Sequence, residues 1–194
     1  MTQEQTAVSD AELLQQAIQT GNSFAIDLLV ERYYGAVNRL TLSILNDPIM
    51  AEDAAQECFV RASLKLGSYR GEASPKTWLF AIAVNICRAQ LRRQQRQQRW
   101  QQLWQRWQPT AANPVSSPET KALQQERYAQ LWTAVDQLHE KHRLPIILRY
   151  VHDMSGPEIA AILGISEGTV YSRLHYAHQK LKAHLVREHH ETFT

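Results

Sequence analysis

Apolar residues recur at helical spacing through most of the chain, and no stretch shows the sustained alternation of a β-strand. The clearest apolar stripe lies in the segment from Ser23 to Asn46, and its members are Ile26, Leu29, Tyr33, Val37, Leu40 and Ile44. The seven glycines and seven prolines stand mostly at the ends of such segments. The pattern predicts an all-α protein.

Capping residues set the expected ends of the helices. A capping box at 9–12 predicts a first helix that ends near Gly21, and the second helix fills 23–46. Asp47-Pro48 predicts the start of a third helix that ends at Gly67, and Ser74-Pro75 predicts the start of a fourth. In the second domain, Ser155 with Glu158, and Ser166, predict the starts of the last two helices.

Three prolines, Pro109, Pro114 and Pro118, interrupt the helical pattern within ten residues and favour an extended, flexible linker. The expected organisation is therefore a helical domain at 1–94, a linker at 95–117 and a second helical domain at 118–194. The linker begins with a Trp/Gln-rich helical extension that carries Trp100, Trp104 and Trp107. We expect these tryptophans to be buried, either in the local core or against a second domain or a regulatory partner.

Composition narrows the class of protein. The 194 residues are 44% hydrophobic and 21% charged, without an apolar run near the ~18 to 20 residues that cross a bilayer. The start of the sequence lacks a cationic and apolar leader, so we expect a cytoplasmic protein. The two cysteines, Cys58 and Cys87, are expected as buried thiols, with a redox switch as the alternative.

The net charge is only +2, but charges of each sign are clustered. The acidic stretch contains Asp47, Glu52, Asp53 and Glu57, and the basic stretch contains Arg88, Arg92, Arg93, Arg96 and Arg99. The chain thus offers surfaces for partners of opposite charge.

The most specific segment, residues 158–170, has the pattern of a helix-turn-helix. Ala160 allows the close approach of two helices, Gly164 permits a left-handed turn, and Val170 belongs to the apolar wedge. The outward face is expected to enter a DNA major groove; the alternative is a helical hairpin with a solvated face. The candidate contacts are Ser166, Glu167, Thr169, Tyr171, Ser172, Arg173, His175, Tyr176, Gln179 and Lys180.

The third helix has two different faces. One is expected in the core and contains Ala51, Ala55, Cys58, Phe59, Ala62 and Leu66. The opposite face mixes polar and aliphatic residues, namely Asp53, Gln56, Glu57, Val60 and Leu64. Aliphatics beside acids indicate a protein-docking surface; a charged surface with two stray aliphatics is the alternative.

The fourth helix and the loop before it predict a nucleic-acid site. Core positions are Trp78, Leu79, Ile82, Ile86 and Ala89, and the other stripe contains Thr77, Ala81, Asn85, Arg88 and Arg92. The loop at 67–74 carries Tyr69 and Arg70 between two glycines, a composition suited to holding an unstacked base. A plain surface loop is the alternative.

Several motifs together resemble a known family. The segments 47–62, 69–79 and 82–85 closely resemble region two of bacterial extracytoplasmic-function (ECF) sigma factors, and 148–150 with 155–175 resemble their region four. The resemblance covers most of residues 9–187 in the family's order.

The resemblance implies a dissociable subunit that gives RNA polymerase its promoter specificity. It implies that Asp53, Gln56 and Glu57 contact the clamp of the largest polymerase subunit, and that region four docks on the flap of the second-largest subunit. The 68–74 loop, with Asn85, Arg88 and Arg92, is implied to capture the melted minus-ten element. The last helix is implied to read the double-stranded minus-thirty-five element, and an anti-sigma factor is an implied partner.

The chain departs from the family pattern at Tyr171, Tyr176 and His178, where many relatives carry Lys or Arg. Fewer fixed charges predict weaker phosphate binding, which protonation of His175 and His178 would partly restore below neutral pH. No Cys or carboxylate spacing accompanies the histidines, so neither a metal nor a cofactor is expected.

The expected function is thus that of an ECF sigma factor that binds core polymerase, selects promoters and assists their melting. The alternative is a helix-turn-helix repressor or activator with a helical partner-binding domain. An enzyme is not expected, because no acid, base or metal constellation converges, and no small-molecule substrate is implied.

Overall fold

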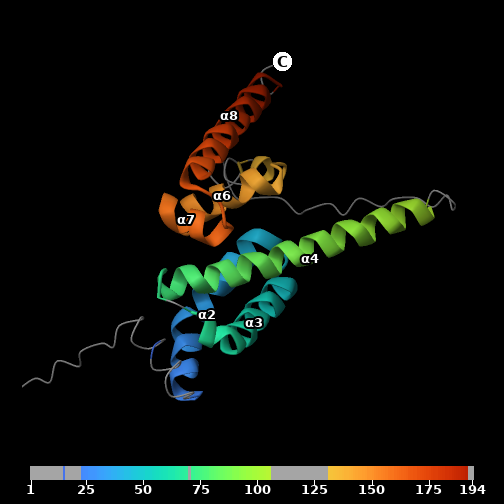
Figure 1. Cartoon of the computed structure of the whole chain (residues 1–194). Helices are drawn as coiled ribbons and strands as arrows, with labels where there is room; N and C mark the ends of the chain where they lie inside the picture. The colour runs from blue at the N-terminus through green and yellow to red at the C-terminus, as the bar shows by residue number, and fades with distance from the viewer. Residues whose placement is uncertain (1–14, 16–22, 70, 106–130, 192–194) are drawn as a thin grey trace, which may run out of the picture. The chain divides into compact units, whose positions relative to one another are not determined.

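The computed structural model describes residues 15, 23–69, 71–105 and 131–191 (Figure 1). Every regular element in these ranges is a helix and none is a strand, which confirms the all-α prediction. Two helical regions lie on either side of residues 106–130. The predicted first helix, apart from Gln15, and the proline-rich break lie outside the described residues.

The chain divides into two compact units, residues 1–91 with 157–165 and residues 92–156 with 166–194. The domain limits expected from the sequence, 1–94, 95–117 and 118–194, stay predictions.

Two helices of the first unit are joined by a tight corner. Helix α2 spans Ser23–Leu45 and α3 spans Pro48–Lys65. Asn46 takes a positive φ of 53°, and the Asp47 carboxylate accepts a hydrogen bond of 2.9 Å from the Met50 amide. This bond supplies the predicted N-cap, and Pro48 occupies a first-turn position where its missing N–H costs nothing.

The apolar stripe of α2 forms the core as predicted. Its members Leu29, Tyr33, Val37, Leu40 and Ile44 are buried, whereas the side chain of Ile26 lies outside the described set. The core face of α3 consists mainly of small residues: Ala51, Ala54, Ala55, Cys58 and Ala62. Small side chains let the two helices approach closely, and the Thr41 hydroxyl on α2 donates a hydrogen bond of 2.9 Å to the Ala51 carbonyl.

Helix α3 ends in a short 3₁₀ turn, Leu66–Ser68, and α4 then spans Pro75–Gln105. The first three turns of α4 are buried on more sides than the sequence predicts, because Phe80, Ala83, Val84 and Cys87 are buried as well as Leu79, Ile82 and Ile86. The prediction that Ala89 faces the core is wrong, since Ala89 is exposed. The Cys58 thiol reaches the Leu79 carbonyl at 3.4 Å, which joins α3 to α4.

The later part of the chain is helical at 131–136 and in α6 (Glu140–Tyr150), α7 (Gly156–Leu163) and α8 (Glu167–Glu191). The sequence patterns did not delimit α6, which carries Pro145 in its interior. Gly164 has a φ of 64°, and the Ile165 amide donates to the Ala160 carbonyl at 3.1 Å. The turn between α7 and α8 is therefore the predicted glycine-dependent turn.

Candidate docking and nucleic-acid surfaces

The predicted docking surface lies open on α3. Val60 is 61% exposed and Leu64 is 81% exposed, and Asp53 and Gln56 are exposed on the same side. Glu57 is half-buried and forms an ion pair with Arg61 one turn later. We call the set Asp53, Gln56, Glu57, Val60 and Leu64 the α3 surface.

Ile49 lies next to the α3 surface, one turn earlier on the helix. It is 76% exposed and stands four residues before Asp53, which places it on the same face. Ile49 was not among the residues expected here, although its four-residue spacing from Asp53 is visible in the sequence. Three exposed aliphatics, Ile49, Val60 and Leu64, thus accompany the polar residues of this face.

The loop before α4 has an internal support. The Tyr69 hydroxyl donates a hydrogen bond of 2.6 Å to the Ala73 carbonyl, and its ring packs against Trp78 with centroids 5.4 Å apart. Gly71 takes a positive φ of 74°, a conformation that favours glycine. Burial raises the pKa of Tyr69 above its ordinary value. Tyr69 therefore shapes the loop, whereas Arg70 lies outside the described residues.

The predicted nucleic-acid stripe of α4 is only partly exposed. Asn85 and Arg92 are exposed and Arg88 is half-buried. Thr77 is different, because it is only 2% exposed and its amide donates to the Ser74 hydroxyl at 3.1 Å. Thr77 is thus part of the helix cap, and the prediction that it lies on the nucleic-acid face is wrong.

The start of α8 is held by its cap. The Ser166 and Thr169 hydroxyls lie 2.8 Å apart, and the Thr169 amide donates to the Ser166 hydroxyl at 3.3 Å. Farther along, Val170, Leu174, Ala177 and Leu181 are buried, as the helical pattern predicts. The outward positions Glu167, Ser172, His175, Gln179 and Lys180 are exposed.

Many outward side chains of α8 already have neighbours. The His175 ring nitrogen lies 2.9 Å from the Gln179 amide nitrogen, and the His178 ring nitrogen lies 2.8 Å from the Tyr150 hydroxyl of α6. Tyr171 is 58% exposed, yet a methyl group on Gly156 would lie 2.6 Å from its hydroxyl oxygen. Several side chains on the polar face of α8 are therefore held by contacts with neighbouring residues.

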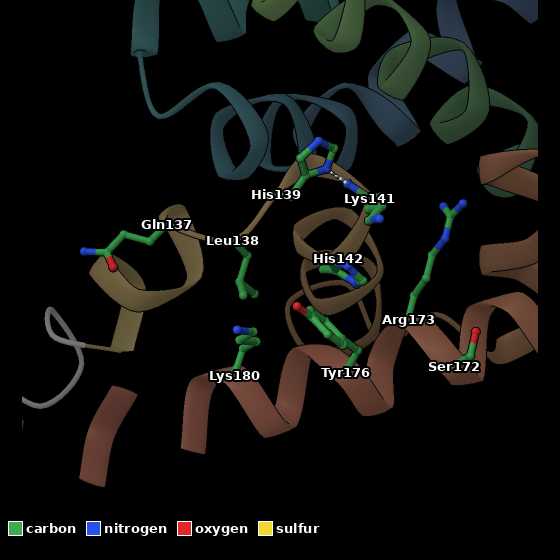
Figure 2. A pocket seen from close by; sticks show the side chains of 9 residues that line it. All are labelled: Gln137, Leu138, His139, Lys141, His142, Ser172, Arg173, Tyr176 and Lys180. Carbon is green, nitrogen blue, oxygen red and sulfur yellow. Dashed lines mark hydrogen bonds between the residues drawn. The ribbon is translucent and has the colours of Figure 1, made fainter. Parts of the chain in front are cut away.

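Tyr176 of α8 packs against α6. Its ring stacks on that of His142 in α6, with centroids 4.3 Å apart and planes 26° apart, and the Lys180 ammonium lies 5.6 Å from its centroid (Figure 2). Burial lowers the pKa of His142 below its ordinary value, and a hydrogen bond to the Arg173 backbone opposes that shift. His142 is therefore favoured in its neutral form.

A second, apolar groove lies farther along α6. It has a volume of about 290 Å³, and its lining residues are Leu131, Trp132, Val135, Ile146, Tyr150, Val151, His178 and Leu181. Tyr150 is 59% exposed, so part of the groove opens to solvent. Such a groove suits an apolar protein segment better than a charged ligand.

Within the described ranges, no group of three or more His, Cys, Asp or Glu side chains is placed to hold a metal ion. No helix there is long and apolar enough to cross a membrane.

Comparison with known proteins defines the class first. Residues 29–97 match the family model for sigma-70 region 2, and residues 128–181 match a model for sigma-70 region 4. The chain therefore has the regions of a bacterial transcription-initiation factor. Relatives that match over most of their length narrow this class to a family.

The chain is 31% identical to the RNA polymerase sigma-H factor of Pseudomonas aeruginosa over 186 residues, covering 93% of this chain and 94% of the relative. It is also 31% identical to the ECF RNA polymerase sigma-E factor of Escherichia coli over 175 residues, covering 88% of this chain and 91% of the relative. The protein belongs to the ECF family of sigma factors.

Solved structures agree with this assignment. The complex of CnrH with the cytosolic domain of CnrY contains a chain similar to this one, with a TM-score of 0.67 and 26% sequence identity over 92% of this chain and 97% of that one. The sigma factor RpoE of Bartonella quintana, solved in complex with the anti-sigma factor NepR, shares the fold with a TM-score of 0.61 and 23% identity. That match covers 82% of this chain and 95% of the other. The family models and the sequence relatives confirm the expected resemblance to ECF sigma factors, and these structures share the fold.

Proposed function

We propose that this sigma factor binds core RNA polymerase through its α3 surface, and that it captures the melted minus-ten element with α4 and the preceding loop. It reads the minus-thirty-five duplex with α8. The observation that carries the proposal is the presence of both sigma regions, in order, on one chain whose α3 surface is exposed. A repressor would need α8 but not the region-two surfaces.

The α3 surface suits the clamp of the largest polymerase subunit. Exposed aliphatics at Val60 and Leu64, with Ile49 beside them, supply apolar area, and the acidic residues Asp53 and Glu57 supply steering toward a basic partner. Apolar contact gives affinity, whereas charge mainly raises the association rate and fixes the orientation.

The minus-ten element is proposed to lie along the loop and the exposed stripe of α4. Asn85 offers an amide for a base edge, and Arg88 and Arg92 offer positive charge for the strand. Binding that favours melted over paired DNA moves the equilibrium toward the open complex, so this chain assists promoter melting without breaking a covalent bond. We therefore propose a non-enzymatic protein that acts in the cytoplasm beside the polymerase.

The apolar groove beside α6 is proposed to receive the flap of the second-largest subunit. Trp132, Ile146 and Val151 form part of its lining, and among the described residues no Asp, Glu, Lys or Arg lines it. The RpoE–NepR complex pairs a protein of this fold with an anti-sigma factor. An anti-sigma factor is proposed as the inhibitor here, acting by covering surfaces that polymerase needs.

A run-off transcription assay tests the proposal. Purified core polymerase is mixed with this protein and a genomic promoter pool, and the RNA ends are sequenced. We expect start sites that share an upstream and a downstream element and that appear only when both proteins are present. Binding of duplex DNA by this protein alone, unchanged by core polymerase and without RNA, would favour the repressor instead.

A further inference from the structure

A groove between α8 and the segment 137–142 carries chemistry that the proposed function does not use. Its volume is about 680 Å³. One wall contains Gln137, Leu138, His139, Lys141 and His142, and the other contains the α8 residues Ser172, Arg173, Tyr176 and Lys180 (Figure 2). The His142 and Tyr176 rings lie face to face between the two walls. The groove lies beside the helix that is proposed to read DNA.

The lining is cationic. It contains the fixed positive charges of Lys141, Arg173 and Lys180, and none of the described residues that line it carries a carboxylate. Within the described part of the chain, no Asp or Glu lies within ion-pair distance of Lys141, Arg173 or Lys180. Unneutralised cations that share one concave surface attract an anion.

The backbone and the rings around the groove are held in place. The His139 ring accepts a hydrogen bond of 3.3 Å from the Lys141 amide, which caps α6 and fixes the backbone that carries Lys141. The stacked His142 and Tyr176 rings hold α6 to α8, and Lys180 extends over the Tyr176 ring. The start of α6 adds a positive helix end to the same wall.

We propose that this groove binds a phosphodiester of the DNA backbone flanking the duplex that α8 reads, with Lys141 as its principal contact from outside the helix-turn-helix. The inference rests on the proposed function. Ser172 and Arg173 belong both to the groove and to the outward face of α8, so a duplex bound to that face brings its backbone beside the groove. This contact compensates for the fixed charges that α8 lacks at Tyr171, Tyr176 and His178.

The test uses the full chain with core polymerase and a promoter fragment from the run-off assay. Dissociation constants are measured across a range of salt for wild type, Lys141→Met and Lys182→Met. Lys182 is exposed on α8 but does not line the groove, so Lys182→Met is a control of equal charge. We expect Lys141→Met to weaken binding about tenfold on every promoter and to lower the salt slope by about 1.

Single methylphosphonate substitutions then locate the phosphate. One upstream position should weaken wild-type binding and have no further effect in Lys141→Met. Equal losses for Lys141→Met and Lys182→Met, or an unchanged salt slope in Lys141→Met, would overturn the proposal.

Two further outcomes are distinguishable. If millimolar inorganic phosphate raises the thermal midpoint of wild type but not of Lys141→Met, while the salt slopes for DNA are equal, the groove holds a free anion and the assignment to DNA is overturned. If wild type itself shows no polymerase-dependent promoter binding, the proposed function fails, and the groove assignment is overturned with it.

Discussion

The exposed faces of α3 and α8 are both proposed to meet a partner, but they are built differently. On α3, the aliphatics Val60 and Leu64 stand 61% and 81% exposed. On α8, exposed polar residues contact each other or α6, as His175 contacts Gln179 and Tyr176 stacks on His142. The face of α3 thus offers exposed apolar area, whereas the polar side chains of α8 are already held by contacts within the protein.

The difference predicts how substitutions act. A change on α3 removes contact area that only a partner uses, so it affects affinity and leaves folding intact. A change on α8 also shifts neighbouring side chains, so its effect on DNA binding depends on residues that never touch DNA.

The largest expected effect is on the α3 surface. Replacing Val60→Asp and Leu64→Asp together should weaken binding to core polymerase about 100-fold, because it places charge in the apolar centre of the interface. Affinity is measured by titrating labelled protein with core polymerase. The thermal midpoint should stay close to that of wild type, since both side chains are exposed in the free protein.

Leu42→Asp is the matched control for this pair. Leu42 is 40% exposed but lies on α2, outside the α3 surface. We expect near wild-type affinity for core polymerase. A loss as large as that of the α3 pair would mean that the binding surface is not confined to α3.

A smaller effect is expected where α8 meets Gly156. Gly156→Ala places a methyl group 2.6 Å from the Tyr171 hydroxyl oxygen, so the exposed Tyr171 ring must swing away. Affinity for the minus-thirty-five duplex should fall about fivefold, while the free energy of unfolding changes by less than about 1 kcal/mol. Duplex affinity of the polymerase complex and urea unfolding measure the two quantities.

A double variant, Gly156→Ala with Tyr171→Ala, tests whether the effect of Gly156→Ala on DNA affinity depends on Tyr171. In a Tyr171→Ala background, Gly156→Ala should cause no further loss of affinity, because the clash has been removed. Additive losses would show that Gly156 acts on DNA binding by another route.

Local chemistry made much of this fold predictable. The Asp47 and Ser74 caps lie where short polar side chains precede a proline, and both hydrogen bonds form. The exposed face of α3 followed from the helical spacing of Val60 and Leu64 with the polar residues beside them. Such features depend on residues within one or two turns, which a sequence displays directly.

Features that depend on distant residues were missed. Helical periodicity assigned Thr77 to a nucleic-acid stripe and Ala89 to the core, whereas tertiary packing buries α4 on more sides and the cap uses Thr77. The pairing of His142 with Tyr176 joins residues of two helices that are far apart in the sequence. No local pattern encodes a contact of that range.

Acid should also weaken the packing of α6 against α8, whereas it should leave the helix that carries the α3 surface unchanged. His142 has a lowered pKa in the folded protein, so the unfolded chain takes up its proton first as the pH falls below ~6.5. The contribution of His142 to the free energy of unfolding is therefore complete above about pH 6.5. It declines as the pH falls from there to the lowered pKa of the folded protein. Hydrogen exchange between about pH 8 and pH 5 should show α6 and α8 losing more protection than α3.

His142→Phe keeps an aromatic ring against Tyr176 but cannot titrate. It should reduce the pH dependence of protection in α6 and α8. An unchanged dependence would assign the acid response to other histidines.

The smallest effect is expected from the two thiols, which belong to the core rather than to either exposed face. Cys58 and Cys87 are fully buried, and burial raises the pKa of each to about 12. Since the thiolate is the reactive form, mild oxidant should leave transcription unchanged, and Ellman's reagent should label neither thiol quickly in the native protein. Both should react at once in urea. Rapid labelling of the native protein, with loss of binding to core polymerase, would instead support the redox switch and would show that the helices behind the α3 surface open readily.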